Sequence, residues 1–333
     1  MTDRPARSTD PITAEVRWRH RFTVLTAVTT VLLLGWGAFV TSINAGLAVP
    51  DWPSSFNSFD PFNPWPEWWK LTPVLAEHGH RLLGALVGLF TLALAVWTWI
   101  KDSRRWMRVL GIGALVLVSL QGTLGGLRVV LLSLDLAVIH ACVAQIYFGL
   151  IVGMALFTSR SWLYGDRGSY DREDAAGIQR VAWLTVGTLY VQIILGALLR
   201  HPGTGIDPML AGLHIAGALL AAVAVIYLYR RAAARHDGTL VLYPAARLLL
   251  ALLVVQVTLG ITAYVVTLDE SGMLDPSNLQ VVVNTAHMVT GALLMGTSVA
   301  AALDASRLRT AESSKPYTDQ LRSVILEKPS ISR

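Results

Sequence analysis

The chain contains little charge and almost no cysteine. Only 15% of its 333 residues are charged, whereas 53% are hydrophobic. This composition is too apolar for a water-soluble domain and indicates a polytopic membrane protein. The single cysteine, Cys142, excludes an intramolecular disulfide, and we expect it to pack within a helix. The first 21 residues have no apolar core, so they do not form a cleaved signal peptide.

Eight apolar runs follow one another along the sequence. A helix of about 20 apolar residues crosses about 30 Å of hydrocarbon. We place the eight at roughly 22–43, 77–100, 106–128, 135–158, 178–200, 209–230, 244–267 and 279–303. The sequence therefore predicts an all-α membrane protein with eight transmembrane helices.

Basic residues are concentrated on one side of these helices. That side holds 23 of the 27 Lys and Arg residues, and the positive-inside rule makes it cytoplasmic. Both termini are therefore expected inside. The net charge of +5 reflects this asymmetry and does not indicate binding to nucleic acid.

The two halves of the chain resemble each other. Gly37-Ala38 near the end of the first helix matches Gly196-Ala197 in the fifth, and Gln121-Gly-Thr-Leu-Gly125 matches Gln256-Val-Thr-Leu-Gly260. Four helices separate the repeated units, so both units run in the same direction and their pseudo-two-fold axis lies along the membrane normal. We expect two pseudo-symmetric four-helix bundles, with short polar segments around them. The boundaries are a tail at 1–21, bundles at 22–158 and 178–303, a linker at 159–177 and a tail at 304–333.

Four histidines lie near the starts of the even-numbered helices: His80, His140, His214 and His287. Ionisable residues inside a membrane are rare unless they bind or relay something. Two histidines on facing helices can hold a haem iron, so we expect His80 and His140 to form one axial pair. His214 and His287 would form the other, in the outer leaflet like the first. A capping or interhelical hydrogen-bonding role is the alternative for any one of them.

One acid distinguishes the two pairs. Glu77 lies three residues before His80 on the same helical face, whereas Ala211 is the equivalent residue before His214. A carboxylate beside one macrocycle only suggests proton transfer or charge stabilisation there. A carboxylate that satisfies free amides at the helix start is the alternative. His78 points elsewhere and is expected at the interface.

The outer boundary carries three arginines and an aromatic loop. Arg81, Arg128 and Arg200 are candidates for pairing with anionic haem propionates, and interfacial snorkelling is the alternative. The loop at 44–76 is rich in Trp and Phe. It either covers the outer mouth of the first bundle or contributes to an interfacial aromatic belt.

These residues together resemble the haem A synthase family, which has bacterial members and mitochondrial homologues that serve cytochrome oxidase assembly. The resemblance covers all eight helices. It rests on Ala45-Gly-Leu-Ala-Val-Pro-Asp-Trp-Pro53, on Glu77-His-Gly-His-Arg81 and on the three later helical histidines.

The resemblance implies an oxidoreductase that converts the C8 methyl group of haem O to a formyl group, giving haem A. It implies that His80 and His140 flank the substrate haem O, that Glu77 is the catalytic acid, and that His214 and His287 ligate a haem b cofactor. It also implies a multi-pass protein of the bacterial plasma membrane. The expected partners are haem O synthase, cytochrome oxidase assembly factors and an electron-transfer partner that the sequence does not identify.

Two features depart from the family pattern. Some relatives have a cysteine pair in the first outer loop, and its absence here excludes a disulfide-based redox or haem-delivery role for this chain. Thr41 stands where many relatives have Arg.

Two other functions fit part of the pattern. A non-catalytic di-haem b-type electron carrier would use the four histidines, but it has little need of an acid beside one haem only. A transporter with histidine proton relays would bind no haem. Pigment analysis of the purified protein distinguishes the three.

Overall fold

The computed structural model describes residues 14–165, 169–170, 172–200, 206–234, 242–269 and 275–310. Among these residues, eight helices are long and apolar enough to cross a membrane. The prediction of an all-α, eight-helix membrane protein is therefore confirmed. The predicted tails lie largely outside the described residues, which begin at residue 14 and end at residue 310.

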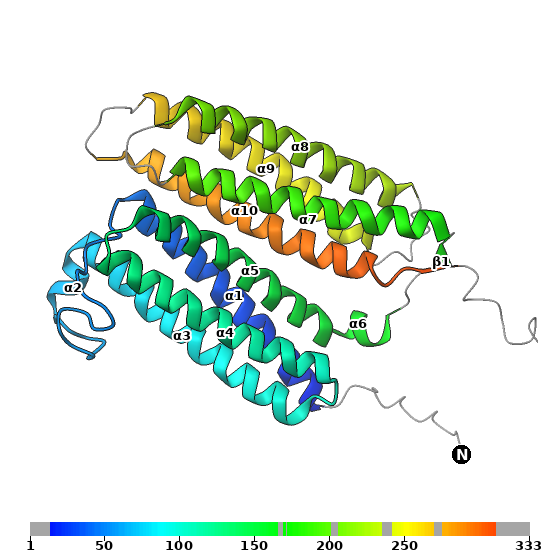
Figure 1. The fold of residues 1–333 in the computed structure, drawn as a ribbon, viewed down its shortest axis with the longest axis horizontal. Helices are drawn as coiled ribbons and strands as arrows, with labels where there is room; N and C mark the ends of the chain where they lie inside the picture. Colours follow the sequence, from blue (N-terminus) through cyan, green and yellow to red (C-terminus); the bar gives the residue numbers. More distant parts are fainter. Residues whose placement is uncertain are drawn as a thin grey trace, which may run out of the picture.

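The long helices form two groups of four (Figure 1). The first group consists of α1 (Ala14–Ser42), α3 (Thr72–Lys101), α4 (Arg105–Val130) and α5 (Leu134–Thr158). The second consists of α7 (Arg172–Arg200), α8 (Pro208–Ala233), α9 (Leu242–Asp269) and α10 (Asn278–Ala305). The short elements are α2 (Glu67–Lys70), α6 (Arg160–Tyr164), and a parallel pair made by β1 (Ser169–Tyr170) and β2 (Arg309–Thr310).

Each group, called here the first and second bundle, repeats the same ring of contacts. Successive helices pack against one another, and the last helix closes back on the first. The bundles meet where α10 packs against α1 and α5, and where α5 packs against α7. This pattern is what a two-fold relation between the bundles requires; the relation itself and the cytoplasmic side of the termini stay predictions.

The starts of three histidine-bearing helices are capped by side chains. Ser133, Asp207 and Ser277 accept hydrogen bonds from amides in the first turns of α5, α8 and α10. Such caps satisfy amides that have no partner within the helix. They set where each helix begins and hence the height of its histidine.

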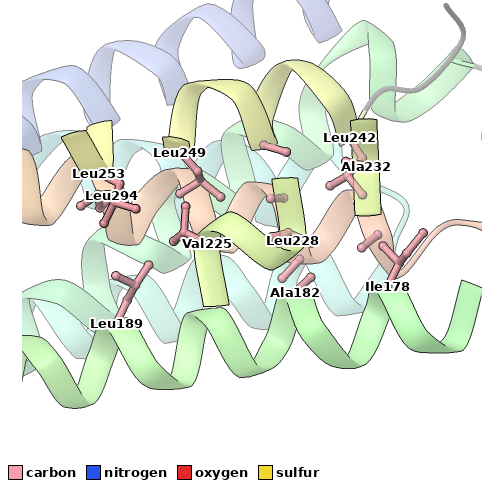
Figure 2. Close-up of a cluster of buried hydrophobic side chains, with 14 of the residues drawn as sticks. Ile178, Ala182, Leu189, Val225, Leu228, Ala232, Leu242, Leu249, Leu253 and Leu294 are labelled. Atoms are coloured by element: carbon pink, nitrogen blue, oxygen red, sulfur yellow. The ribbon is translucent and has the colours of Figure 1, made fainter. Parts of the chain in front are cut away.

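The second bundle is held together by aliphatic side chains. Figure 2 shows Ile178, Leu189, Val225, Leu228 and Leu249 meeting between α7, α8 and α9, where each is at most 5% exposed. In the first bundle, the buried apolar cluster of Val87, Leu94, Met107, Ile151 and others lies among buried hydroxyl groups. The side chain of Thr91 hydrogen-bonds that of Tyr147 in this interior.

A buried ion cluster closes the end of the first bundle opposite the outer loop. Arg19 of α1 lies 3.0 Å from Asp102, which also binds Arg104 at 2.8 Å. Burial opposes ionisation of Asp102, but its hydrogen bonds with Arg104 and the charge of Arg19 lower its pKa below the ordinary value. This cluster extends α1 to Ala14, eight residues before the start expected from hydropathy, because the polar turns are anchored to the α3–α4 connection.

Candidate functional site

The four predicted histidines lie at similar heights in their helices. They are residues 7 to 10 counted from the first residue of α3, α5, α8 and α10. At 1.5 Å of rise per residue, this range covers only about 5 Å. All four are partly buried. The common helix direction thus brings the four imidazoles to one level of the molecule.

His214 and His287 face each other in the second bundle. Their ring centres lie 6.4 Å apart, with an angle of 71° between the ring planes. Metal–imidazole bonds are about 2 Å in zinc sites, and the ring centre lies about 1 Å beyond the nitrogen. Two imidazoles on opposite sides of one metal ion therefore have centres about 6 Å apart, so this pair fits a shared metal.

His80 and His140 are brought together in the first bundle. The two imidazoles lie close enough to interact electrostatically. The guanidinium groups of Arg81 and Arg128 also lie close enough to His80 to do so. The Nδ1 atoms of His80 and His287 are buried and have no hydrogen-bond partner among the described residues. A buried ring nitrogen without a partner is costly unless it binds something.

The edge of every one of these imidazoles rests against a glycine of a neighbouring helix. A Cβ added to that glycine would come within 2.9 to 3.2 Å of the ring's Cε1 atom. The pairs are Gly37 with His80, Gly125 with His140, Gly196 with His214, and Gly260 with His287. The repeated glycines thus let the helix backbone approach each ring closely, which fixes where the ring can lie.

The donor set suits a metal that already has other ligands. Among the described residues, no three His, Cys, Asp or Glu side chains gather as a metal site. Each histidine pair supplies only two ligands. A haem iron takes four ligands from the porphyrin and can take two from the protein. The residues present therefore fit a haem.

Glu77 is buried at the outer end of the first bundle, with 3% of its surface exposed. Its Oε1 atom accepts a hydrogen bond from Arg81 at 2.9 Å, and its Oε2 atom accepts one from the amide of Val49 at 2.9 Å. The amide that Glu77 satisfies therefore belongs to the outer loop and not to the start of its own helix. The carboxylate is held as a hydrogen-bond acceptor beside the first histidine pair.

Arginines tie the first part of the outer loop to the bundle. Arg81 donates to the carbonyl oxygens of Val49, Asp51 and Ser54. Arg128 donates to the carbonyl oxygen of Gly46 at 2.9 Å, and its guanidinium occupies the place that a Cβ on this residue would take. Two of the three arginines predicted to meet propionates thus anchor the loop; the pairing of all three with propionates stays a prediction.

Residues 44–58 of this loop form a lid over the first bundle. Ala45 and Val49 are buried, and the ring of Trp52 lies on Gly126 of α4, where an added Cβ would overlap it. Asp51 organises the turn that follows. Burial opposes its ionisation, but hydrogen bonds from Ser54 and from the amides of Asn57 and Phe56 lower its pKa.

The second part of the loop presents aromatic rings to the surroundings. Phe59, Phe62, Trp65 and Trp69 are 54 to 81% exposed. His78 lies buried under this part, where it hydrogen-bonds the carbonyl oxygen of Pro61 at 2.8 Å and meets the ring of Trp68. His78 is thus covered by the loop, and its location at the membrane interface stays a prediction. Residues 44–58 thus cover the first bundle, and an interfacial aromatic belt formed by the exposed rings stays a prediction.

Arg200 and Cys142 lie near the boundary between the bundles. Arg200 donates to the carbonyl oxygen of Thr41 in α1 at 3.4 Å, and its Nε atom is buried without a partner among the described residues. A buried guanidinium with a free donor suits an anionic group. Cys142 is partly buried in α5, and the hydroxyl of Tyr190 in α7 donates to its backbone carbonyl.

Sequence reasoning missed the loop contacts and the partners of the imidazoles. The anchoring groups at Gly46 and Val49 are backbone atoms, which leave no signal in the side-chain pattern. The glycine–imidazole contacts did leave a signal in the sequence: the Gln-x-x-x-Gly spacing occurs three times, at 121–125, 192–196 and 256–260.

Comparison with known proteins gives one consistent result. A family model described as "Cytochrome oxidase assembly protein" (COX15-CtaA) matches residues 20–210, more than half of the chain. A protein of Symbiobacterium thermophilum named "Heme A synthase" is 31% identical over 268 residues, which are 70% of this chain and 82% of the relative. Proteins of the same name from Lysinibacillus sphaericus and Alkalihalophilus pseudofirmus are 29% and 26% identical, over 56% and 54% of this chain and 59% of each relative.

Proposed function

Because the chain belongs to the COX15-CtaA family of cytochrome oxidase assembly proteins, we propose that it is a haem A synthase. It is a membrane-bound oxidoreductase that oxidises the C8 methyl group of haem O to a formyl group. The observation that carries the proposal is the pair of histidine sites with an acid at only one of them. A di-haem carrier would have no use for that difference.

In this proposal the first bundle binds the substrate. His80 and His140 hold haem O by its iron, and the lid at 44–58 separates the site from the outer solution. Arg81, Arg128 and Arg200 provide positive charge at the outer ends of the helices, and the single carboxylate of Glu77 offsets part of the charge of the first two. The substrate's propionates would supply the missing negative charge.

Glu77 acts on the reacting edge of the substrate. Conversion of a methyl to a formyl group removes four electrons and four protons from the methyl carbon and one water molecule, which supplies the formyl oxygen. The electrons pass to the unidentified redox partner, and positive charge develops at the carbon as they leave. A fixed carboxylate in a site of low dielectric stabilises that charge or accepts the proton. The amide of Val49 and the guanidinium of Arg81 hold the carboxylate in place.

The second bundle serves as the electron-transfer half. His214 and His287 would hold haem b, which supplies one-electron chemistry when bound. The chain's own contribution there is to fix both imidazoles and to keep water out with its aliphatic core. The redox partner and the assembly partners named above are part of the proposal.

Expression of the full chain in a bacterium that makes haem O but no haem A tests the function. Extracted pigments are expected to contain haem A, and a His80→Ala/His140→Ala variant is expected to leave only haem O. If the membranes contain the intact chain but no haem A or hydroxylated intermediate, the proposal is wrong.

The proposed orientation has its own test. A cysteine at Ser58 should react with an impermeant thiol reagent in intact cells, and one at Ser169 should react only after lysis. The Cys142→Ser variant provides the background. The reverse pattern would contradict an outer-leaflet location of the histidines.

A further inference from the structure

Three of the four histidines have a glutamine as a neighbour. Gln121, Gln192 and Gln256 each lie four residues, about one helical turn, before the glycine on which the imidazole rests. In α1 the residue four before Gly37 is Leu33. The glutamine is therefore part of a repeated unit that His80 alone lacks.

The glutamine of α7 contacts its histidine at both backbone and ring. Its amide nitrogen donates to the backbone carbonyl of His214 at 2.8 Å and lies 3.1 Å and 3.3 Å from the two ring nitrogens. In α9 the amide nitrogen of Gln256 lies 3.3 Å from a ring nitrogen of His287. Gln121 donates to the backbone carbonyl of His140 at 3.0 Å.

Space for two of these side chains comes from a second glycine on the histidine helix. A Cβ on Gly217 would overlap Oε1 of Gln192, and one on Gly291 would lie 3.3 Å from Nε2 of Gln256. Both glycines are three or four residues after their histidine, on the same helical face. The second bundle thus has a notch that holds each carboxamide beside its imidazole.

The carboxamides have unused hydrogen-bonding capacity. The Oε1 atoms of Gln121, Gln192 and Gln256 are buried without a hydrogen-bond partner among the described residues. A buried carbonyl without a donor is costly, because it has lost its hydrogen bonds to water. An imidazole that binds a metal through one nitrogen carries a proton on the other, and that N–H needs an acceptor. A rotation of the terminal amide would present such an acceptor to the ring.

We propose that Gln192 and Gln256 are positioning residues for the second histidine pair. Each carboxamide binds one nitrogen of its imidazole, holds the ring against the glycine of the same unit, and leaves the other nitrogen for the iron of haem b. This inference rests on the proposed function, because it assigns the second bundle a resident haem.

The contacts between carboxamides and histidines differ between the two bundles. Both histidines of the second pair have a carboxamide at the ring, Gln121 donates to the backbone carbonyl of His140, and a leucine stands at the corresponding position for His80. A resident cofactor needs fixed ligands, whereas a substrate must enter and leave. The glutamines therefore distinguish the cofactor site from the substrate site.

The test uses the full chain purified with its haem b. Gln192→Leu and Gln256→Leu introduce the residue type that occurs naturally at Leu33, and they should lose haem b to apomyoglobin about 10–100-fold faster than the wild type. They should also shift the low-spin electron paramagnetic resonance signal and raise the midpoint potential, because a ligand without its hydrogen bond is less basic and favours ferrous iron. Gln192→Glu and Gln256→Glu keep the acceptor and should lower the potential and retain the haem.

Gln280→Leu is the matched control, since this glutamine lies on the same helix as His287 but its amide meets Thr267. It should leave all three measurements unchanged. Leu and Glu variants that match the wild type in haem release, spectrum and potential would overturn the inference. Leu and Glu variants that shift the potential in the same direction would also overturn it, because a purely structural role predicts no opposition. A wild type that holds haem b but makes no haem A would refute the proposed function and leave this test intact.

Discussion

The outer ends of the two bundles differ far more than their helices do. In the first bundle a carboxylate, two guanidinium groups and a glycine hold a lid over the histidines. The repeat aligns each of them with an apolar residue of the second bundle: Glu77 with Ala211, Arg81 with Ile215, Gly126 with Ile261, and Arg128 with Ala263. Along the described helices, one fold thus carries a site lined by these groups and a site with apolar residues in their places.

The interiors are more alike. The first bundle buries Thr23, Thr26, Thr30, Thr91 and Thr98, and the second buries Thr185, Asn284, Thr290 and Ser298 beside its aliphatic cluster. Hydroxyls that donate to their own helix backbone add polarity without an unpaired donor. The contrast at the aligned positions around the histidines is what the proposed division into a substrate half and a cofactor half predicts.

Removing a histidine should have the largest effect, and the effect should differ between the two bundles. His214→Ala or His287→Ala leaves a haem b iron with one axial ligand, so the purified protein should lose its low-spin haem b. His80→Ala should keep haem b and stop production of haem A. Pyridine haemochrome spectra and pigment extraction measure both. Equal loss of haem b from all three variants would show that the bundles do not divide the work.

Neutralising the carboxylate of Glu77 in the first bundle should have the second-largest effect. Glu77→Gln keeps the shape and an acceptor oxygen but removes the charge, so the rate of haem A formation should fall about 100-fold while haem b stays bound. The rate is read from pigment time courses. Glu15→Gln, which alters a carboxylate near Arg19 at the other end of the bundle, is the control and should keep the parental rate. A Glu77→Gln variant with parental activity would reduce Glu77 to an anchor of the lid.

A side chain at Gly126, where the ring of Trp52 packs on α4, should loosen only the lid of the first bundle. The Cβ of Gly126→Ala would overlap the indole ring, and overpacking of this kind costs about 1–3 kcal/mol. Amide hydrogen exchange in residues 44–58 should become faster. Ile261→Ala, the equivalent position in the second bundle, is 63% exposed and should change exchange nowhere in the loop. Unchanged exchange in Gly126→Ala would mean that Trp52 does not hold the lid.

Acid should have the smallest effect, confined to the turn after the lid. The pKa of Asp51 is lowered in the folded loop, so its contribution is fully present above the ordinary value of 3.8 and is lost as the pH falls through the lowered value. Tryptophan fluorescence of the wild type should therefore change below about pH 4. Asp51→Asn should lack this transition. An identical acid titration of the two proteins would show that the ionised carboxylate does not order the turn.

Much of the fold could be predicted from the sequence because the bilayer constrains the length and composition of its helices. Apolar runs of helical length gave the eight helices, and the repeat of Gly-Ala and Gln-x-x-x-Gly indicated the two halves. The common depth of His80, His140, His214 and His287 follows from similar positions in parallel helices. Helix ends were less accurate: α1 begins at Ala14 because Arg19 and Asp102 pair at the inner end, a contact between helices that hydropathy does not register.

By itself the sequence determined the fold class, the four imidazoles and the single acid, because each depends on residue type and spacing along one helix. Only the tertiary structure decided what surrounds them. The lid depends on backbone groups at Gly46 and Val49, which the side-chain pattern does not reveal. The second pair depends on Gln192 and Gln256 reaching across to another helix. Contacts of this kind arise from how helices pack: the Gln-x-x-x-Gly repeat shows which residues recur, but it does not show which imidazole each carboxamide reaches.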